Sequence, residues 1–246
     1  MGSYYISSRG IFMARLLVLL TFLSLSHSLV LAEGATAIGK IVVDASKDGG
    51  AWTYPQRQSD FDPKKDHQGK AFADYLRSQG WALDEITPGE DITERLAGAA
   101  IVIRTDSVFT SSYEESEVRA YREYVSRGGN VLLIHGFVRN GSTNTDKVAK
   151  EFGITFSKTV NAPTIKRWAQ HSLTKELDLI PYKVGSVVTD SPKSTVPLAY
   201  LDDDQIVMGM VEIGKGKVIF LSTTRPLVVV QPPFIKRVLD EFTKKN

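Results

Sequence analysis

Short apolar runs alternate with amphipathic stretches through the first half of the chain. The apolar runs occupy residues 40–44, 81–86, 99–104 and 130–135. Each is short and close to continuous in its apolar character, which is typical of a strand buried on both faces. Between them, apolar residues recur at helical spacing over residues 71–76 and 118–125, and residues 91–96 favour a short helix.

Residues with special backbone properties mark where the predicted helices begin and end. Gly80 ends the first helix, and Gly128 ends the helix that contains residues 118–125. Ser112 and Glu115 have the spacing of a capping box, in which each side chain satisfies a free amide at the helix start. The pattern therefore predicts strand and helix in regular alternation up to residue 135.

The second half of the chain has a less regular pattern. Residues 145–152 favour a helix, and residues 157–182 are loop-rich with one short helix near Leu173. Two apolar runs flanking Gly214-Lys215-Gly216 predict a late β-hairpin over residues 206–221. The last helix begins at Pro232 and Pro233 and presents an apolar face that runs to Phe242.

Repeated alternation of strand and helix defines the expected fold class. Right-handed crossovers between successive strands produce a parallel sheet that helices cover on both faces. We therefore expect an α/β protein in which residues 38–246 form one domain. The composition agrees, because 42% hydrophobic and 24% charged residues are ordinary values for a globular chain.

The first residues read as an export signal. Arg15 precedes an apolar run over residues 16–31, and Val30-Leu31-Ala32 fits a small-residue cleavage site. We expect a signal peptide over residues 1–32, with Met13 as an alternative start of translation. The other interpretation is an anchor that is never cleaved, but the run is short and interrupted for a spanning helix. The expected location is periplasmic or secreted, with no membrane contact after cleavage.

Charge and cysteine content exclude several function classes. Cleavage removes Arg9 and Arg15 from 30 basic residues and leaves 28, which equals the 28 acidic residues. Nucleic acid is therefore not an expected partner. The chain has no cysteine, so disulfides, thiolate metal ligands and a cysteine nucleophile are all excluded.

Residues 121–136, YREYVSRGGNVLLIHG, carry a resemblance to a known superfamily. A helix ending in two glycines, a short apolar strand and His-Gly resemble the middle of class I glutamine amidotransferase-like domains, in particular the trehalose-utilisation-type branch. Three further segments agree in order along the chain: residues 152–154, 171–174 and 214–218. The resemblance covers residues 38–243 and implies a flavodoxin-like three-layer sandwich with a mostly parallel central sheet and a late β-hairpin.

The chain departs from this superfamily at the residues that perform catalysis. Active amidotransferases carry a cysteine at the turn after the central strand and a His-x-Glu pair late in the chain. Here His135-Gly136-Phe137 occupies the turn, and Ser222 to Arg225 stand near the position of the late pair. The resemblance implies a fold and a pocket position, and it argues against glutamine hydrolysis.

The carboxyl ends of the strands are where such sheets bind ligands, and two candidate catalytic residues end strands there. Asp44 ends the first strand, and it is either catalytic or orders the loop that follows. His135 ends the fourth strand and suits a general base. No Gly-x-Ser-x-Gly elbow accompanies it, so a Ser-His-Asp hydrolase has little support.

The long loop after the first strand supplies candidate ligand-binding residues. Trp52 and Tyr54 suit stacking on a sugar, with Gln56 bonding to its hydroxyls. The alternative is that both aromatic side chains form a lid over the end of the sheet. The remaining candidates for ligand binding are Gln68, Asp106 and Arg167.

Three histidines are the candidate metal ligands. His67, His135 and His171 would converge on the same rim if the fold is as expected, and imidazole suits zinc and other divalent metals. Their spacing matches no local metal motif, and the alternative is that each bonds to loop backbone separately. No cofactor is expected, and the alternative to this expectation is a divalent metal.

Two functional hypotheses remain. The first is an exported, non-catalytic amidotransferase-like binding or scaffold domain whose ligand, a carbohydrate or an envelope protein, lies at the carboxyl ends of the strands. The second is a hydrolase or isomerase acting on a sugar-like substrate, with or without a metal. Sugars enter both hypotheses through the trehalose-utilisation-type resemblance, which is an analogy of fold.

Overall fold

The computed structural model describes residues 37–47, 69–105, 112–136, 144–157, 159–224 and 230–244. By its contacts the chain divides into two units, residues 1–37 and residues 38–246. In the described part of the chain, no helix combines the length and the apolar character needed to cross a membrane.

An eight-stranded sheet forms the centre of the second unit, in the order β2-β1-β3-β4-β12-β11-β10-β7. The parallel strands are β1 (Lys40–Asp44), β2 (Ala82–Ile86), β3 (Ile101–Thr105), β4 (Asn130–Ile134) and β12 (Gly216–Leu221). Antiparallel pairing adds β11 (Ile206–Ile213), β10 (Val196–Tyr200) and β7 (Arg167–Trp168). The expected α/β class with a mostly parallel central sheet is confirmed.

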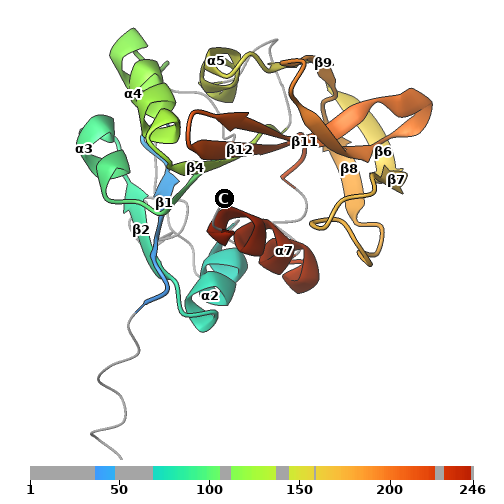
Figure 1. Cartoon of the computed structure of the whole chain (residues 1–246), viewed down its shortest axis with the longest axis horizontal. Helices are drawn as coiled ribbons and strands as arrows, with labels where there is room; N and C mark the ends of the chain where they lie inside the picture. The colour runs from blue at the N-terminus through green and yellow to red at the C-terminus, as the bar shows by residue number, and fades with distance from the viewer. Residues whose placement is uncertain are drawn as a thin grey trace, which may run out of the picture. The chain divides into compact units, whose positions relative to one another are not determined.

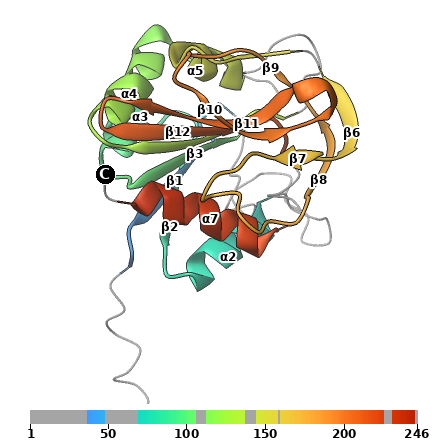
Figure 2. The same cartoon turned by 45° about the vertical axis from the view of Figure 1, so that its right-hand side comes forward.

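Helices lie on both faces of the sheet (Figures 1 and 2). On one face lie α3 (Ile92–Ala97), α4 (Glu115–Ser126) and α5 (Asn144–Glu151). On the other lie α2 (Lys70–Ser78) and α7 (Pro232–Thr243). The buried residues form two clusters that follow this division, one containing the apolar side chains of α2 and α7 and the other those of α3, α4 and α5.

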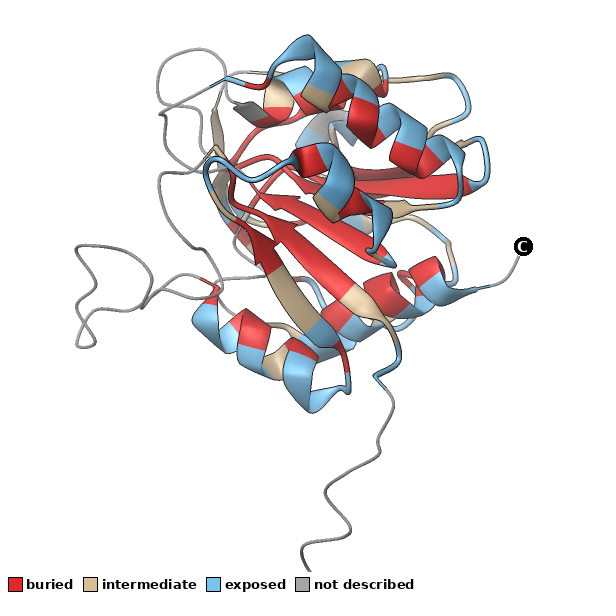
Figure 3. Cartoon of the chain, turned by 90° about the vertical axis from the view of Figure 1, so that its left-hand side faces the viewer, coloured by how far each residue is buried: buried red, intermediate tan, exposed pale blue. Residues whose placement is uncertain are grey.

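The apolar runs of the sequence become the buried strands because both faces of the sheet are covered. Every residue of β3 is buried, as are the last four residues of β1 and of β4 (Figure 3). The helices bury one stripe each, such as Val118, Tyr121 and Val125 of α4. The pattern of apolar residues therefore distinguishes the strands of the central layer, which are apolar throughout, from the helices of the outer layers, which are apolar on one face.

The start of α4 differs from the sequence prediction. The helix begins at Glu115, and the amide of Glu114 donates to Oε2 of Glu117 at 2.7 Å. A capping box of Ser112 and Glu115 is therefore wrong by two residues. The glutamates at 114 and 117 have the same three-residue spacing, so the pattern alone could not choose between the two registers.

The segment expected to be loop-rich, residues 157–182, contains strands. They are β6 (Val160–Thr164), β7 and the start of β8 (Pro181–Gly185), while β5 (Thr155–Phe156) and β9 (Val188–Asp190) lie just outside the segment. The short helix predicted near Leu173 is a series of turns. The strands are two to five residues long, and β6 and β8 contain proline, so their patterns are too short to recognise from sequence.

The predicted hairpin of β11 and β12 is present, and its turn depends on glycine. Gly214 has a φ of 61°, and a Cβ at this position would lie 2.5 Å from the carbonyl oxygen of Ser126 at the end of α4. A residue with a side chain would therefore push the hairpin away from the helix. This close approach fixes β12 beside β4.

Candidate site at the carboxyl ends of the strands

The carboxyl ends of β1, β3 and β4 lie next to one another. Asp44 pairs in register with Arg104, and Thr105 pairs with Ile134, so the three strands end at the same level. Most buried polar side chains of the described chain lie at this level or in the segments that pack on it: Asp44, Ser46, Arg104, Thr105, His135, Thr145, Ser186, Ser222 and Thr223. The expectation that Asp44 and His135 lie at the same end of the parallel strands is confirmed.

The strand order places a topological switch point at this edge. β1 lies between β2 and β3, while α2 and α4 lie on opposite faces of the sheet (Figure 1). In open α/β sheets such a point opens a crevice outside the carboxyl ends of the two strands, and ligands bind there. Asp44 ends one of these strands and Ser46 follows it, and Thr105 ends the other.

Asp44 is fully buried, and both oxygens of its carboxylate accept hydrogen bonds. Oδ2 accepts from the hydroxyl of Tyr113 at 2.6 Å and from that of Tyr121 at 2.5 Å. Oδ1 accepts from the amide of Ser46 at 2.9 Å. Three donors compensate the buried charge, which would otherwise be costly. These are the contacts of a residue that orders its surroundings, which is the structural alternative raised for Asp44.

Tyr121, one of the two tyrosines that bond to Asp44, remains a donor over the ordinary pH range. Burial raises the pKa of Tyr121 well above its usual value, and the negative charge of Asp44 raises it further. The rings of Tyr113 and Tyr121 meet edge to face with centroids 6.0 Å apart. Neither tyrosine was expected at the site, because the apolar spacing of Tyr121 indicated only a core position.

Two basic residues lie near the ring of Tyr113. The guanidinium of Arg104 is fully buried, donates through Nη1 to the main-chain oxygen of Asp44 at 2.9 Å, and lies 5.2 Å from the ring centroid of Tyr113. Nζ of Lys47 lies 5.3 Å from the same centroid and pairs with Glu117 at 2.8 Å. The sequence placed Arg104 at the end of its strand but gave no signal that it is buried.

His135 is fully buried, and both of its ring nitrogens have partners. Nδ1 lies 2.7 Å from the hydroxyl of Ser186, and Nε2 lies 3.0 Å from Oδ1 of Asp146. The ring stacks on Phe156 with centroids 4.2 Å apart. A carboxylate only accepts, so the neutral ring carries its proton on Nε2 and accepts at Nδ1 from the Ser186 hydroxyl.

A chain of serine, histidine and aspartate therefore exists that sequence reasoning missed. Ser186 lies between β8 and β9, far from His135 along the chain and outside any Gly-x-Ser-x-Gly elbow, so no local motif could reveal it. The residue is fully buried, its amide donates to the carbonyl of Ser222, and its own carbonyl accepts from the hydroxyl of Tyr182. The arrangement joins β4, α5 and the β8–β9 turn.

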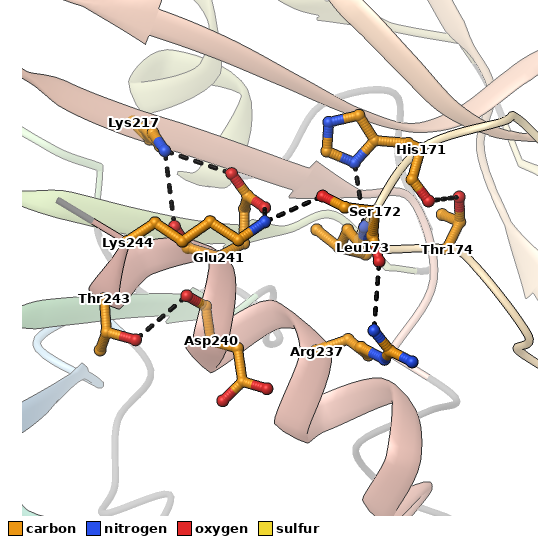
Figure 4. A network of polar contacts seen from close by, with 10 residues as sticks. All are labelled: His171, Ser172, Leu173, Thr174, Lys217, Arg237, Asp240, Glu241, Thr243 and Lys244. Carbon is orange, nitrogen blue, oxygen red and sulfur yellow. Dashed lines mark hydrogen bonds and ion pairs between the residues drawn. The ribbon is translucent and has the colours of Figure 1, made fainter. Parts of the chain in front are cut away.

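His171 lies in a different environment from His135. Its Nδ1 accepts from the amide of Leu173 at 3.1 Å, and the neighbouring Ser172 hydroxyl accepts from Lys244 at 2.8 Å (Figure 4). Lys244 also bonds to Glu241, which pairs with Lys217 near the amino end of β12. His171 thus belongs to contacts at the other end of the parallel strands.

The histidine site for a metal gains no support from the described residues. Among them, no group of three or more His, Asp or Glu side chains could hold a metal ion. His67, the third expected ligand, lies outside the residues that the structure describes. Of the two described histidines, His171 bonds to loop backbone as in the alternative, whereas His135 bonds to the side chains of Ser186 and Asp146.

Arg167 lies on the edge strand β7 and is half exposed. Its guanidinium lies 3.9 Å from the ring centroid of Tyr200 and pairs with Asp204. Its charge is therefore already engaged within the chain. The other predicted ligand-binding residues lie outside the described part: Trp52, Tyr54, Gln56, Gln68 and Asp106. Their roles stay predictions.

Comparisons with known proteins identify relatives of the fold only. No family model matches the chain, and no curated protein matches it. Among solved structures, the mmIFT52 N-terminal domain is similar with a TM-score of 0.61 and 15% identity, covering 84% of this chain and 98% of that one. Cytoplasmic Protein STM1381 from Salmonella typhimurium LT2 has a TM-score of 0.60 and 15% identity over 83% of this chain and all of that one.

A glycosidase shares the fold over part of its length. The β-galactosidase from Rahnella sp. R3 has a TM-score of 0.52 and 16% identity over 85% of this chain. The match covers 32% of the enzyme, so this chain corresponds to about a third of its length. At these identities the similarity concerns the fold and carries no activity with it.

Proposed function

We propose that the chain is an exported, non-catalytic binding domain with a flavodoxin-like, amidotransferase-like three-layer fold, and that it binds carbohydrate at the carboxyl ends of β1, β3 and β4. The signal-like segment at residues 1–32 supports export. The switch point and its buried polar residues support the location of the binding site.

One observation carries the non-catalytic part of the proposal. Asp44 and His135, the two residues at this edge best suited to acid–base chemistry, are fully buried, and each hydrogen-bonds inside the chain through all of its oxygens or ring nitrogens. A general acid or base must reach the proton that it transfers. Because the chain also has no cysteine, it lacks the nucleophile of glutamine hydrolysis.

The choice of carbohydrate rests on two analogies of fold. The sequence resembles the trehalose-utilisation-type branch of its proposed superfamily. The chain also has the fold of a part of the β-galactosidase from Rahnella sp. R3. Fold is weak support for a ligand class, so the ligand needs a direct test.

The test is binding without turnover. The mature protein, residues 33–246, is titrated with a panel of neutral oligosaccharides in a calorimeter, and each mixture is afterwards analysed by chromatography for products. The proposal expects saturable binding of at least one saccharide that is recovered intact. Recovery of hydrolysed or isomerised sugar contradicts the non-catalytic part, and no binding across the panel contradicts the carbohydrate part, leaving an envelope protein as the partner to seek.

The alternative function, a sugar-directed hydrolase, gains one specific observation. Ser186, His135 and Asp146 form a hydrogen-bonded chain with distances of 2.7 Å and 3.0 Å, as a nucleophile, base and orienting group require. Against it, Ser186 has no exposed surface. A fluorophosphonate probe separates the two cases, since labelling of wild type but not of Ser186→Ala would favour the hydrolase.

A further inference from the structure

Ser46 is a buried residue that follows β1 at the switch point. Only 5% of the residue is exposed. Its amide is fixed by donation to Oδ1 of Asp44 at 2.9 Å. Its hydroxyl oxygen is buried and has no hydrogen-bond partner within the described part of the chain.

A buried hydroxyl without a partner is unfavourable, because it has lost its bonds to water and gained none in return. Such groups are rare in native proteins, and each calls for an explanation, such as strain, a functional role, or a water or ion that completes the bond. Asp44 beside it shows the usual outcome, since its buried oxygens accept three hydrogen bonds.

We propose that the hydroxyl of Ser46 is a direct contact for a hydroxyl group of a neutral saccharide bound at the switch point between β1 and β3. This inference rests on the proposed function and names a residue of that site. Two independent observations support the choice of Ser46. The strand order gives the switch point, and the local packing leaves the hydroxyl without a partner.

The charges around Ser46 favour a neutral ligand over an anion. Lys47, the next residue, pairs with Glu117 at 2.8 Å. The buried cation of Arg104 lies beside the buried anion of Asp44, bonded to its main-chain oxygen. The charge of Lys47 is thus matched by that of Glu117, and Arg104 already donates to the main chain, which weakens the field that would attract an anion. A serine hydroxyl both donates and accepts, as a sugar hydroxyl does.

The first experiment needs no ligand. Ser46→Ala removes a hydroxyl without a partner, so the melting temperature should stay unchanged or rise. Thr174→Val is the matched control, because it removes a buried hydroxyl that donates to the carbonyl of Ala169 at 2.6 Å, in a segment that contacts α7. The control should melt about 2–4 °C lower. A comparable fall for Ser46→Ala would show that its hydroxyl has a partner inside the protein and would overturn the inference.

The second experiment uses a saccharide that the wild-type protein binds in the oligosaccharide panel. Ser46→Ala should bind it about tenfold more weakly, the effect of one lost hydrogen bond. Thr174→Val should bind as wild type at a temperature where both are folded. Equal affinity of Ser46→Ala and wild type overturns this inference alone, whereas a wild type that binds no saccharide overturns the proposed function and this inference with it.

Discussion

The two ends of the parallel strands bury charge in different ways. At the amino end, Lys217 of β12 meets Glu241 of α7 at 3.2 Å, with both side chains less than 8% exposed. Lys244 adds a second cation and ties the helix to Ser172 (Figure 4). At the carboxyl end, the charge of Asp44 is met by two tyrosine hydroxyls and an amide.

The amino end is thus held by an ion pair, and the carboxyl end by neutral donors to a carboxylate. An ion pair between a helix and a strand fastens the two elements together and leaves each charge with its partner. Hydrogen bonds from neutral donors stabilise a buried carboxylate without cancelling its charge, and they hold the surrounding backbone in place. In the described chain, the unpartnered hydroxyl of Ser46 lies at the second end, where a strand order of this type also places ligands.

Removing the carboxylate at the carboxyl end should give the largest loss of stability. Asp44→Ala leaves the hydroxyls of Tyr113 and Tyr121 buried without an acceptor, at a cost of about 1–3 kcal/mol each. We therefore expect the free energy of unfolding in urea to fall by roughly 2–6 kcal/mol. The control Tyr113→Phe removes one donor and leaves Asp44 with two others, so it should lose about 1 kcal/mol. An Asp44→Ala variant as stable as wild type would show that this cluster is not structural.

At the amino end, the loss should be smaller because Glu241 has two lysine partners. Lys217→Met removes one of them and leaves Lys244, so the free energy of unfolding should fall by about 2–3 kcal/mol, below the ~3–5 kcal/mol typical of a fully isolated buried charge. The double variant Lys217→Met, Glu241→Leu should recover most of this loss, since a buried pair is often replaceable by apolar side chains. No recovery in the double variant would mean that the charges themselves hold α7 in place.

The sequence predicted the sheet better than it predicted these polar contacts, for a physical reason. Ile41 to Val43 and Ile101 to Ile103 carry the pattern of buried strands within a few residues, so local reading suffices. The partners of Asp44 and His135 lie between 2 and 77 residues away, and only the folded chain brings them together. Tyr121 was predicted to be buried from its spacing, yet nothing in that spacing shows where its hydroxyl bonds.

The serine–histidine bond tests a smaller part of the carboxyl end. Ser186→Ala removes the donor to Nδ1 of His135 and should lower the free energy of unfolding by about 1–2 kcal/mol. Ser186→Thr keeps a hydroxyl and serves as the comparison, although its added methyl group must fit a fully buried site. Thermal and urea unfolding both report the change. Equal stability of Ser186→Ala and wild type would weaken the structural role given to His135 and strengthen the case for a latent catalytic chain.

The pH dependence of stability should separate the two ends, with the smallest effect of these predictions. At the amino end, burial alone would raise the pKa of Glu241, but hydrogen bonds from Lys244 and Lys217 and their charges hold it below its ordinary value of 4.5. A carboxyl with a lowered pKa in the folded state stabilises the protein fully above that ordinary value, and the contribution is lost as the pH falls through the folded-state pKa. At the carboxyl end, the raised pKa of Tyr121 has the opposite sign, because its contribution is complete below a pH of about 10 and is lost as the pH rises toward the folded-state pKa.

Urea midpoints measured from pH 3 to 11 give a curve of stability against pH, with an acid limb that reports Glu241 and an alkaline limb that reports Tyr121. Glu241→Gln should flatten the acid limb and leave the alkaline limb unchanged, because it removes the titrating group while Lys217 and Lys244 keep a polar neighbour. Tyr121→Phe should do the reverse, at the cost of one hydrogen bond to Asp44 at every pH. If both variants altered the same part of the curve, the two ends of the sheet would be coupled through the strands that join them. The distinction between an amino end held by an ion pair and a carboxyl end proposed to bind ligand would then have to be abandoned.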